Sequence, residues 1–159
     1  KIIQKEKEMK NEVIQIRRVE GKEHIKLLME FNQMLDDEMT ALMPVFLRDP
    51  FDKPVPATYW EDIASGTGGF ALLAWDADRP AGMALIEYGK CAHFESLIVL
   101  PAYRHQGIGK MLVDQSLEQV RRDGYKLMTL NVLLNNESAE SLYAQAGFEG
   151  YKKTMAIEL

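Results

Sequence analysis

The residues best suited to chemistry lie between a short apolar run and an amphipathic pattern: residues 104–110 read Arg-His-Gln-Gly-Ile-Gly-Lys. The apolar run from Phe94 to Leu100 predicts a buried strand that ends at Pro101, because proline cannot donate to a ladder. The following pattern predicts a helix whose apolar face consists of Ile108, Met111, Leu112, Leu117 and Val120. The first N–H groups of a helix lack partners, the helix dipole is positive there, and glycine allows close approach to the backbone. This strand, turn and helix therefore predict an anion site.

Two common phosphate motifs do not fit this turn. A P-loop needs glycine where this chain has Arg104, and serine or threonine where it has Met111. A dinucleotide fingerprint needs a third glycine three residues after Gly109, where Leu112 stands. The pattern that does match is Arg/Gln-x-x-Gly-x-Gly/Ala after an apolar strand. It resembles the pyrophosphate-binding motif of the GNAT superfamily of N-acetyltransferases, which hold acetyl-coenzyme A.

A second motif supports this resemblance. Residues 136–148 read Asn-x-x-Ala-x-x-Leu-Tyr-x-x-x-Gly-Phe, which is similar to the other GNAT signature at the same spacing. The resemblance covers about Val13 to Leu159 and is specific from Glu95 to Phe148. It implies an α+β fold with a mixed, mostly antiparallel sheet flanked by helices. The fourth and fifth strands would run parallel and splay apart, so that the pantetheine arm of the coenzyme enters the gap.

The resemblance also implies which groups bind acetyl-coenzyme A as co-substrate. Backbone N–H groups of the turn from His105 to Lys110 would hold the diphosphate, with charge added by Arg104 and Lys110. The strand edge near Leu97 and Val99 would bond the pantetheine amides, and an N–H there could polarise the thioester carbonyl. Asn136 would contact the pantetheine or phosphate region besides capping its helix. The predicted cofactor-binding set is Leu97, Val99, Arg104, His105, Gln106, Gly107, Ile108, Gly109, Lys110 and Asn136.

Acetyl transfer to an amine requires a neutral nucleophile, and deprotonating an alkylamine of pKa about 10 at pH 7 costs about 4 kcal/mol. Glu95 is the candidate general base. Strand alternation predicts that it shares a face with Leu97 and Val99, where apolar surroundings would raise its pKa. A structural carboxylate bonded to a neighbouring loop is an equally open interpretation. His93 is a second candidate base on the same face, and substrate or water acting alone is the remaining alternative.

Tyr143 matches the usual general acid of the family, with its hydroxyl near the departing thiolate. The alternative role is a tyrosine that packs its helix onto the sheet. Other chemistries fit less well, because His24, His93 and His105 lack metal-ligand spacing and Cys91 lacks a defined histidine partner. We therefore expect direct attack by the amine, with no metal and no acyl-enzyme.

Length and composition limit the class of protein, the number of domains and the compartment. The chain has 159 residues, of which 47% are hydrophobic and 27% charged, as in a single globular domain. We expect residues 1–12 to form an N-terminal extension, with Met9 as a candidate natural start, and residues 13–159 to form one N-acetyltransferase domain. The single cysteine, Cys91, excludes an intrachain disulfide and suits a reducing cytoplasm.

The partners expected from composition are small or peptide-borne amines. A net charge of −5 argues against nucleic acid and mildly favours cationic ligands. No run approaches the roughly 20 apolar residues that cross a bilayer, so we expect no membrane partner. The family is often dimeric, which makes a homodimer a reasonable expectation.

The remaining elements are predicted from periodicity and from turn residues. Strands are expected at Val13–Arg17, Phe70–Trp75, Ala81–Tyr88, Lys126–Leu134 and Tyr151–Leu159. Helices are expected from Glu20 to about Leu35, from a capping box at Thr58–Glu61 to about Ala64, and after Asn136. A hairpin turn is expected at Asp76–Pro80, and a proline-containing loop at Arg48–Pro56.

Three consecutive carboxylates, Asp36 to Glu38, follow the first predicted helix. They predict either a solvated helix end or a cation-attracting wall beside a substrate cleft. The leading function is an acetyl-coenzyme A-dependent N-acetyltransferase for a primary amine of a small molecule or a peptide, with cationic small molecules favoured. The alternatives are a non-catalytic acyl-coenzyme A-binding sensor and a fold kept only for dimerisation. The presence of Glu95 and Tyr143 favours the enzyme, and the glycine turn argues against a purely structural role.

Overall fold

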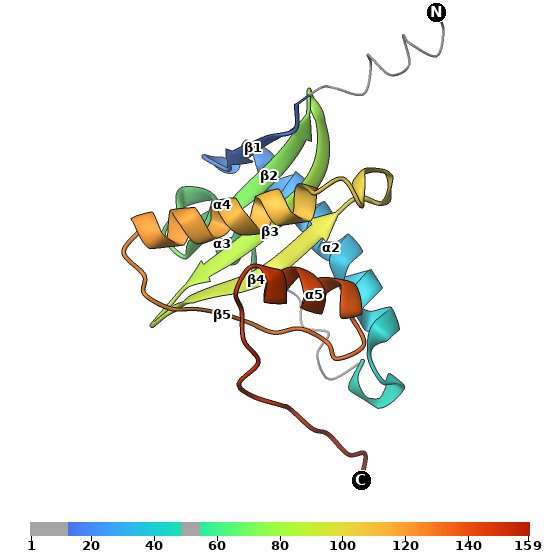
Figure 1. Ribbon diagram of the computed structural model, residues 1–159. Helices are drawn as coiled ribbons and strands as arrows, with labels where there is room; N and C mark the ends of the chain where they lie inside the picture. The colour runs from blue at the N-terminus through green and yellow to red at the C-terminus, as the bar shows by residue number, and fades with distance from the viewer. Residues whose placement is uncertain (1–12, 49–54) are drawn as a thin grey trace, which may run out of the picture.

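The computed structural model describes residues 13–48 and 55–159. Their centre is a five-stranded sheet in the order β1-β2-β3-β4-β5 (Figure 1). The strands are β1 Gln15–Arg18, β2 Gly69–Asp76, β3 Arg79–Tyr88, β4 Ala92–Val99 and β5 Met128–Leu130. Neighbouring strands are antiparallel except for β4 and β5, which are parallel. The predicted mixed sheet is confirmed.

Helices cover both faces of the sheet, as Figure 1 shows. They are η1 Lys22–His24, α2 Ile25–Leu42, η2 Val45–Leu47, α3 Ala57–Ser65, η4 Pro101–Tyr103, α4 Ile108–Arg122 and α5 Glu137–Gln145. Helices α4 and α5 lie on one face, and α2 and α3 lie on the other. Among the described residues, no helix combines the length and apolarity needed to cross a membrane.

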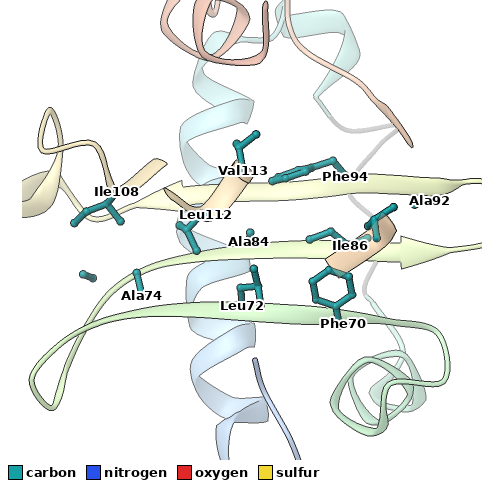
Figure 2. Packing of buried hydrophobic residues seen from close by; sticks show 12 residues of the cluster. Phe70, Leu72, Ala74, Ala84, Ile86, Ala92, Phe94, Ile108, Leu112 and Val113 are labelled. Carbon is teal, nitrogen blue, oxygen red and sulfur yellow. The ribbon is translucent and has the colours of Figure 1, made fainter. Parts of the chain in front are cut away.

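Alternation along the strands divides the core into two clusters. On β2, Phe70 and Leu72 pack toward α4, as Figure 2 shows, whereas Ala71 and Leu73 pack toward α2 and α3. The α4 cluster is completed by residues that include Ala84, Ile86, Phe94, Ile108, Leu112 and Val113. The α2 and α3 cluster includes Leu28, Phe31, Trp60, Ile63, Met83, Leu85 and Ile98. The sheet is therefore buried on both sides, and it holds β4 rigidly between the two helical layers.

Two predicted helix boundaries were wrong. Helix α2 runs to Leu42 instead of Leu35, so the acidic run lies inside the helix and not at its end. The chain has no glycine or proline in this stretch before Pro44, and the helix continues until proline disfavours the helical conformation of the residue before it. Helix α3 begins after Pro56 without a side-chain cap, so the expected capping box at Thr58 does not form.

The C-terminal predictions were also wrong in part. Strand β5 has three residues where nine were expected, and the segment Tyr151–Leu159 is not a strand. In Figure 1 this segment, drawn in red, runs away from the sheet, and its apolar side chains are exposed. Alternation identifies the two faces of a strand but supplies no partner, and a strand forms only where an edge receives its hydrogen bonds.

Several predictions fall on residues outside the described ranges. These are the extension at residues 1–12 with Met9, and most of the loop predicted at Arg48–Pro56. The β2–β3 hairpin is confirmed, with Ala77 and Asp78 forming its turn.

Candidate active site

The predicted anion-binding turn lies directly before α4. Gly107 occupies the N-cap position with φ +81°, and His105 has φ +60°, so two residues of the turn adopt the left-handed conformation. A Cβ on Gly107 would meet nothing within 4 Å, which means that backbone conformation and not space requires the glycine. Left-handed residues in such a turn direct successive N–H groups to the same side, where they form an anion-binding hollow.

The head of α4 provides backbone donors for an anion. The helix is 15 residues long, and the N–H of Met111 donates to the carbonyl of Gly107 at 3.0 Å. In the described part of the chain, the N–H groups from Gly107 to Lys110 donate to no protein acceptor. The structure thus places the glycine turn, the free donors and the positive end of the dipole together, as an anion site needs.

The charged side chains of the turn bond to other parts of the protein. Arg104 donates from Nε to the carbonyl of Val99 at 2.8 Å and from Nη2 to Glu38 Oε1 at 2.6 Å, and so links β4 to α2. Lys110 pairs with Asp114 one turn along α4. Gln106 donates to the carbonyl of Ala102 at 3.2 Å. The added charge predicted from Arg104 and Lys110 stays a prediction, since reaching a ligand would require both side chains to exchange partners.

Gly109 lies where α4, α5 and β4 meet. A Cβ there would come within 3.3 Å of Leu142 Cδ2 and 3.8 Å of Val99 Cγ2. The neighbouring Ile108 is 1% exposed and anchors the head of α4 in the core (Figure 2). The first motif therefore contacts the second through this glycine, and the two signatures pack as one unit.

The seam between β4 and β5 opens as predicted. Pairing covers only Ala92 to Phe94 of β4 against Met128 to Leu130 of β5. Leu100 N donates to Ala81 of β3, and N–H groups alternate in direction along a strand. The N–H groups of Leu97 and Val99 consequently face the seam, where no described strand accepts their hydrogen bonds. This is the edge expected to bond the pantetheine amides.

Glu95 lies on the opposite face of β4 from the one predicted. Ser96 pairs with Leu85 and Phe94 pairs with Ile86, which leaves Glu95 as the extra residue of a β-bulge. A bulge reverses the alternation of the residues beyond it. Leu97 and Val99 therefore pack toward α4 together with Phe94, whereas Glu95 lies toward α2 and α3, where its charge interacts with Asp36 and Tyr59.

The neighbours of Glu95 on that face are polar. His93 Nε2 lies 3.5 Å from Glu95 Oε2, so the prediction that these two residues share a face is confirmed. Partial burial raises the pKa of Glu95, the negative charges of Glu87 and Asp36 raise it further, and His93 lowers it. The predicted direction of the pKa shift is correct, but nearby carboxylates contribute to it as well as desolvation.

Two residues of this face were not identified from the sequence. Tyr59 of α3 donates from its hydroxyl to Glu87 Oε1 at 2.7 Å. Burial and this hydrogen bond raise the pKa of Tyr59, so it stays protonated and remains a donor. Thr129 of β5 contacts His93, with Oγ1 2.9 Å from Nδ1. No local pattern marks these residues, because each partner comes from a different element.

Tyr143 lies on the α4 face of β4. Its ring packs edge-to-face against Phe94 at 5.8 Å and against Phe148 at 5.9 Å between centroids. Burial raises the pKa of Tyr143 to about 12, so its hydroxyl keeps its proton throughout the neutral range. The contacts demonstrate the packing role, and the retained proton is what a general acid needs.

Asn136 caps α5 as predicted, because its Oδ1 accepts from the N–H of Ala139 at 3.3 Å. Its Nδ2 points toward Met39 Sδ of α2 at 4.0 Å. The capping role is confirmed, and a contact with the coenzyme stays a prediction.

With this geometry in place, comparison with known proteins identifies the family. Residues 31–148 match the Acetyltransferase (GNAT) family. The chain belongs to this family. The resemblance found in the two sequence motifs is confirmed.

The chain is similar to curated N-acetyltransferases and to solved structures, among them two relatives and one aminoglycoside N-acetyltransferase. It is 29% identical over 77 residues to the uncharacterized N-acetyltransferase YfmK of Bacillus subtilis, covering 48% of this chain. It is 30% identical over 90 residues to N-alpha-acetyltransferase 30 of Schizosaccharomyces pombe, covering 53% of this chain. These matches span 52% and 60% of the relatives' own lengths. An aminoglycoside N-acetyltransferase in complex with CoA has the same fold, with TM-score 0.68 and 17% identity over 92% of this chain and 95% of that one.

Proposed function

We propose that this protein is an acetyl-coenzyme A-dependent N-acetyltransferase that acetylates a primary amine by direct attack. The observation that carries the proposal is the open β4–β5 seam, with Glu95 on one face of β4 and Tyr143 on the other. Membership of the acetyltransferase family and the fold shared with an enzyme in complex with CoA support it.

The coenzyme fits the residues that surround the seam. The free N–H groups at the head of α4 would hold its diphosphate, and the backbone groups of Leu97 and Val99 would bond its pantetheine amides. Acetyl-coenzyme A supplies a thioester whose acetyl carbon is open to attack. An N–H of the β4 edge would stabilise the negative charge that develops on the thioester oxygen.

Glu95 and Tyr143 would carry the two proton transfers. Glu95 accepts the proton that the amine loses as its nitrogen bonds to the acetyl carbon. Tyr143 donates its proton to the sulfur as the carbon–sulfur bond breaks, which releases a thiol, and solvent later restores the tyrosine. The raised pKa of Glu95 makes it a stronger base, and Tyr143 is protonated in the neutral range. No covalent enzyme intermediate is needed.

A cationic acceptor is supported by charge on the α2 and α3 face. Asp36 and Glu87 both lie close enough to Glu95 to raise its pKa, so three carboxylates meet on this face. Glu38 instead pairs with Arg104, and Asp37 accepts from Gln33 Nε2 at 2.9 Å. Asp36 accepts an equivalent bond from Asn32 Nδ2 at 2.9 Å, but of the three consecutive acids it is the one whose charge raises the pKa of Glu95. We propose a small molecule with more than one amine as the acceptor.

One assay separates the enzyme from a binding module. Purified protein is incubated with acetyl-coenzyme A and a panel of polyamines, aminoglycosides and peptides with free N-termini. Thiol release is followed, and the acetylated product is identified by mass. We expect release with the cationic amines. Coenzyme binding without release across the panel would favour the sensor instead.

We further propose that residues 13–159 act as one domain in a cytoplasmic homodimer. Absence of a second cysteine suits a reducing compartment. Light scattering during size-exclusion chromatography measures the mass, and twice the 18.1 kDa of the chain is the expected value.

A further inference from the structure

A line of polar side chains crosses the β4–β5 seam and ends at Glu95. His93 and Thr129 are register partners on the two parallel strands, next to the last pair before the seam opens. Thr129 Oγ1 lies 2.9 Å from His93 Nδ1, and His93 Nε2 lies 3.5 Å from Glu95 Oε2. Cys91 Sγ lies 3.9 Å from the same Thr129 oxygen. One histidine thus faces a hydroxyl with one nitrogen and a carboxylate with the other.

The hydrogen-bonding capacity of these groups favours one direction of donation, from Thr129 to His93 and from His93 toward Glu95. An ionised carboxylate only accepts, and a neutral imidazole carries one N–H and one lone pair. If Nδ1 carried the proton, the Nε2 lone pair would face the carboxylate. If Nε2 carries it, Nε2–H points at Glu95 and Nδ1 accepts from the Thr129 hydroxyl. The Thr129 oxygen can then accept from the Cys91 thiol, and Nε2–H faces an accepting carboxylate.

We propose that Thr129 is a positioning residue that fixes the Nε2–H tautomer of His93, which in turn aims Glu95 and favours its charged form. This rests on the proposed function, in which Glu95 is the general base. It assigns His93, considered above as a second base, the role of orienting the first. A hydrogen bond to the partner nitrogen commonly sets which imidazole nitrogen carries the proton.

The groups around Glu95 make the effect measurable. Glu87 of β3 and Asp36 of α2 raise its pKa, Tyr59 of α3 interacts with it electrostatically and bonds Glu87, and His93 of β4 lowers its pKa. The lowering by His93 is the effect of its positive charge, and the neutral ring would act on Glu95 only through the Nε2–H that faces the carboxylate. Loss of its N–H donor should raise the pKa of Glu95 and shift the acidic limb of kcat/KM to higher pH.

The test compares Thr129→Val, which removes the hydroxyl while keeping the shape, with Thr129→Ser, which keeps the hydroxyl. Loss of one neutral hydrogen bond should shift the acidic limb upward by about 0.5 to 1 pH unit in Thr129→Val. Thr129→Ser should keep the wild-type limb. A purely structural role would lower the melting temperature of Thr129→Val and leave the pH profile in place, and that result would overturn the proposal.

His93→Gln supplies a second comparison, because a glutamine amide can donate to Glu95 without having tautomers. Adding Thr129→Val to His93→Gln should shift the limb no further. An additional shift equal to that in the wild-type background would show that Thr129 acts independently of His93 and would contradict the proposal.

Imidazole ¹⁵N chemical shifts test the inference without catalysis, with the signals of His93 assigned from their absence in His93→Gln. Wild type and Thr129→Ser should show a protonated Nε2 and a bare Nδ1, whereas Thr129→Val should show a mixture. A protonated Nδ1 in wild type, or a tautomer insensitive to Thr129→Val, would overturn the inference. If the amine panel gave no acetylation, the proposed function would fail while these spectra still decided the tautomer.

Discussion

On the face of β4 that α4 covers, Phe94 and Tyr143 lie in apolar surroundings, whereas on the face toward α2 and α3, Glu95 and His93 lie among polar side chains. The α4 side is built from two continuous motifs that pack together at Gly109. The other side gathers residues from α2, α3, β3, β4 and β5. The contrast suggests that one side of β4 is specialised for a constant coenzyme and the other for a particular acceptor.

Removing the proposed base on the polar face should produce the largest effect. Glu95→Gln should lower kcat/KM about 100-fold, because general base catalysis is lost while the shape is retained. Since the pKa of Glu95 is raised, wild-type activity should fall as the pH drops through a value above the ordinary carboxyl range, and this limb should disappear in the variant. Steady-state pH profiles measure both. The control is Glu38→Gln, whose parent carboxylate pairs with Arg104, and it should keep the fall in activity at low pH. If Glu95→Gln also kept this fall at the wild-type pH, Glu95 would be excluded as the base.

On the apolar face, Tyr143→Phe should lower kcat by about tenfold or more, since the sulfur then leaves without a proton donor. Coenzyme affinity, measured by calorimetry, should stay as in wild type because the ring contacts with Phe94 and Phe148 remain. Wild-type kcat should also show no basic limb from Tyr143 below its pKa of about 12. Unchanged turnover would leave Tyr143 with its packing role alone.

The coenzyme side can be tested with two glycines at opposite ends of α4. Gly107 and Gly124 both have left-handed backbone, with φ +81° and +89°, and a Cβ on either meets nothing within 4 Å. Gly107→Ala and Gly124→Ala should therefore carry similar strain, but only Gly107→Ala should weaken coenzyme binding, by about tenfold. Equal affinities in the two variants would show that the turn before α4 does not hold the ligand.

The smallest expected effect lies on the acceptor side. Asp36→Asn should raise KM for a cationic amine by about threefold, because one charge near Glu95 is lost. Asp37→Asn is a matched control, since Asp36 and Asp37 each accept a hydrogen bond from the side chain four residues earlier in α2. KM for acetyl-coenzyme A should not change in either variant. Equal amine KM values for the two variants would show that Asp36 has no role in binding the acceptor.

This comparison also explains what the sequence could and could not predict. The glycine turn and the cap at Asn136 follow from local signals, whereas the parallel β4–β5 pair followed from the resemblance to the family, and these predictions were confirmed. The face of Glu95 was mispredicted because the residues after the bulge, Leu97 to Val99, are all apolar and carry no sign of the reversed alternation. Thr129 and Tyr59 could not be identified, because their partners lie in other elements and only the folded structure brings them together.

The central claim is that the head of α4 and the open edge of β4 hold the coenzyme between the two faces. Titration of ¹⁵N-labelled protein with coenzyme A, followed through its backbone amide signals, tests this directly. Signals from Gly107 to Lys110, Leu97 and Val99 should move together with one dissociation constant, while those of Arg122 to Gly124 at the far end of α4 should stay in place. Saturable shifts confined to other residues, or no shifts at all, would contradict the account.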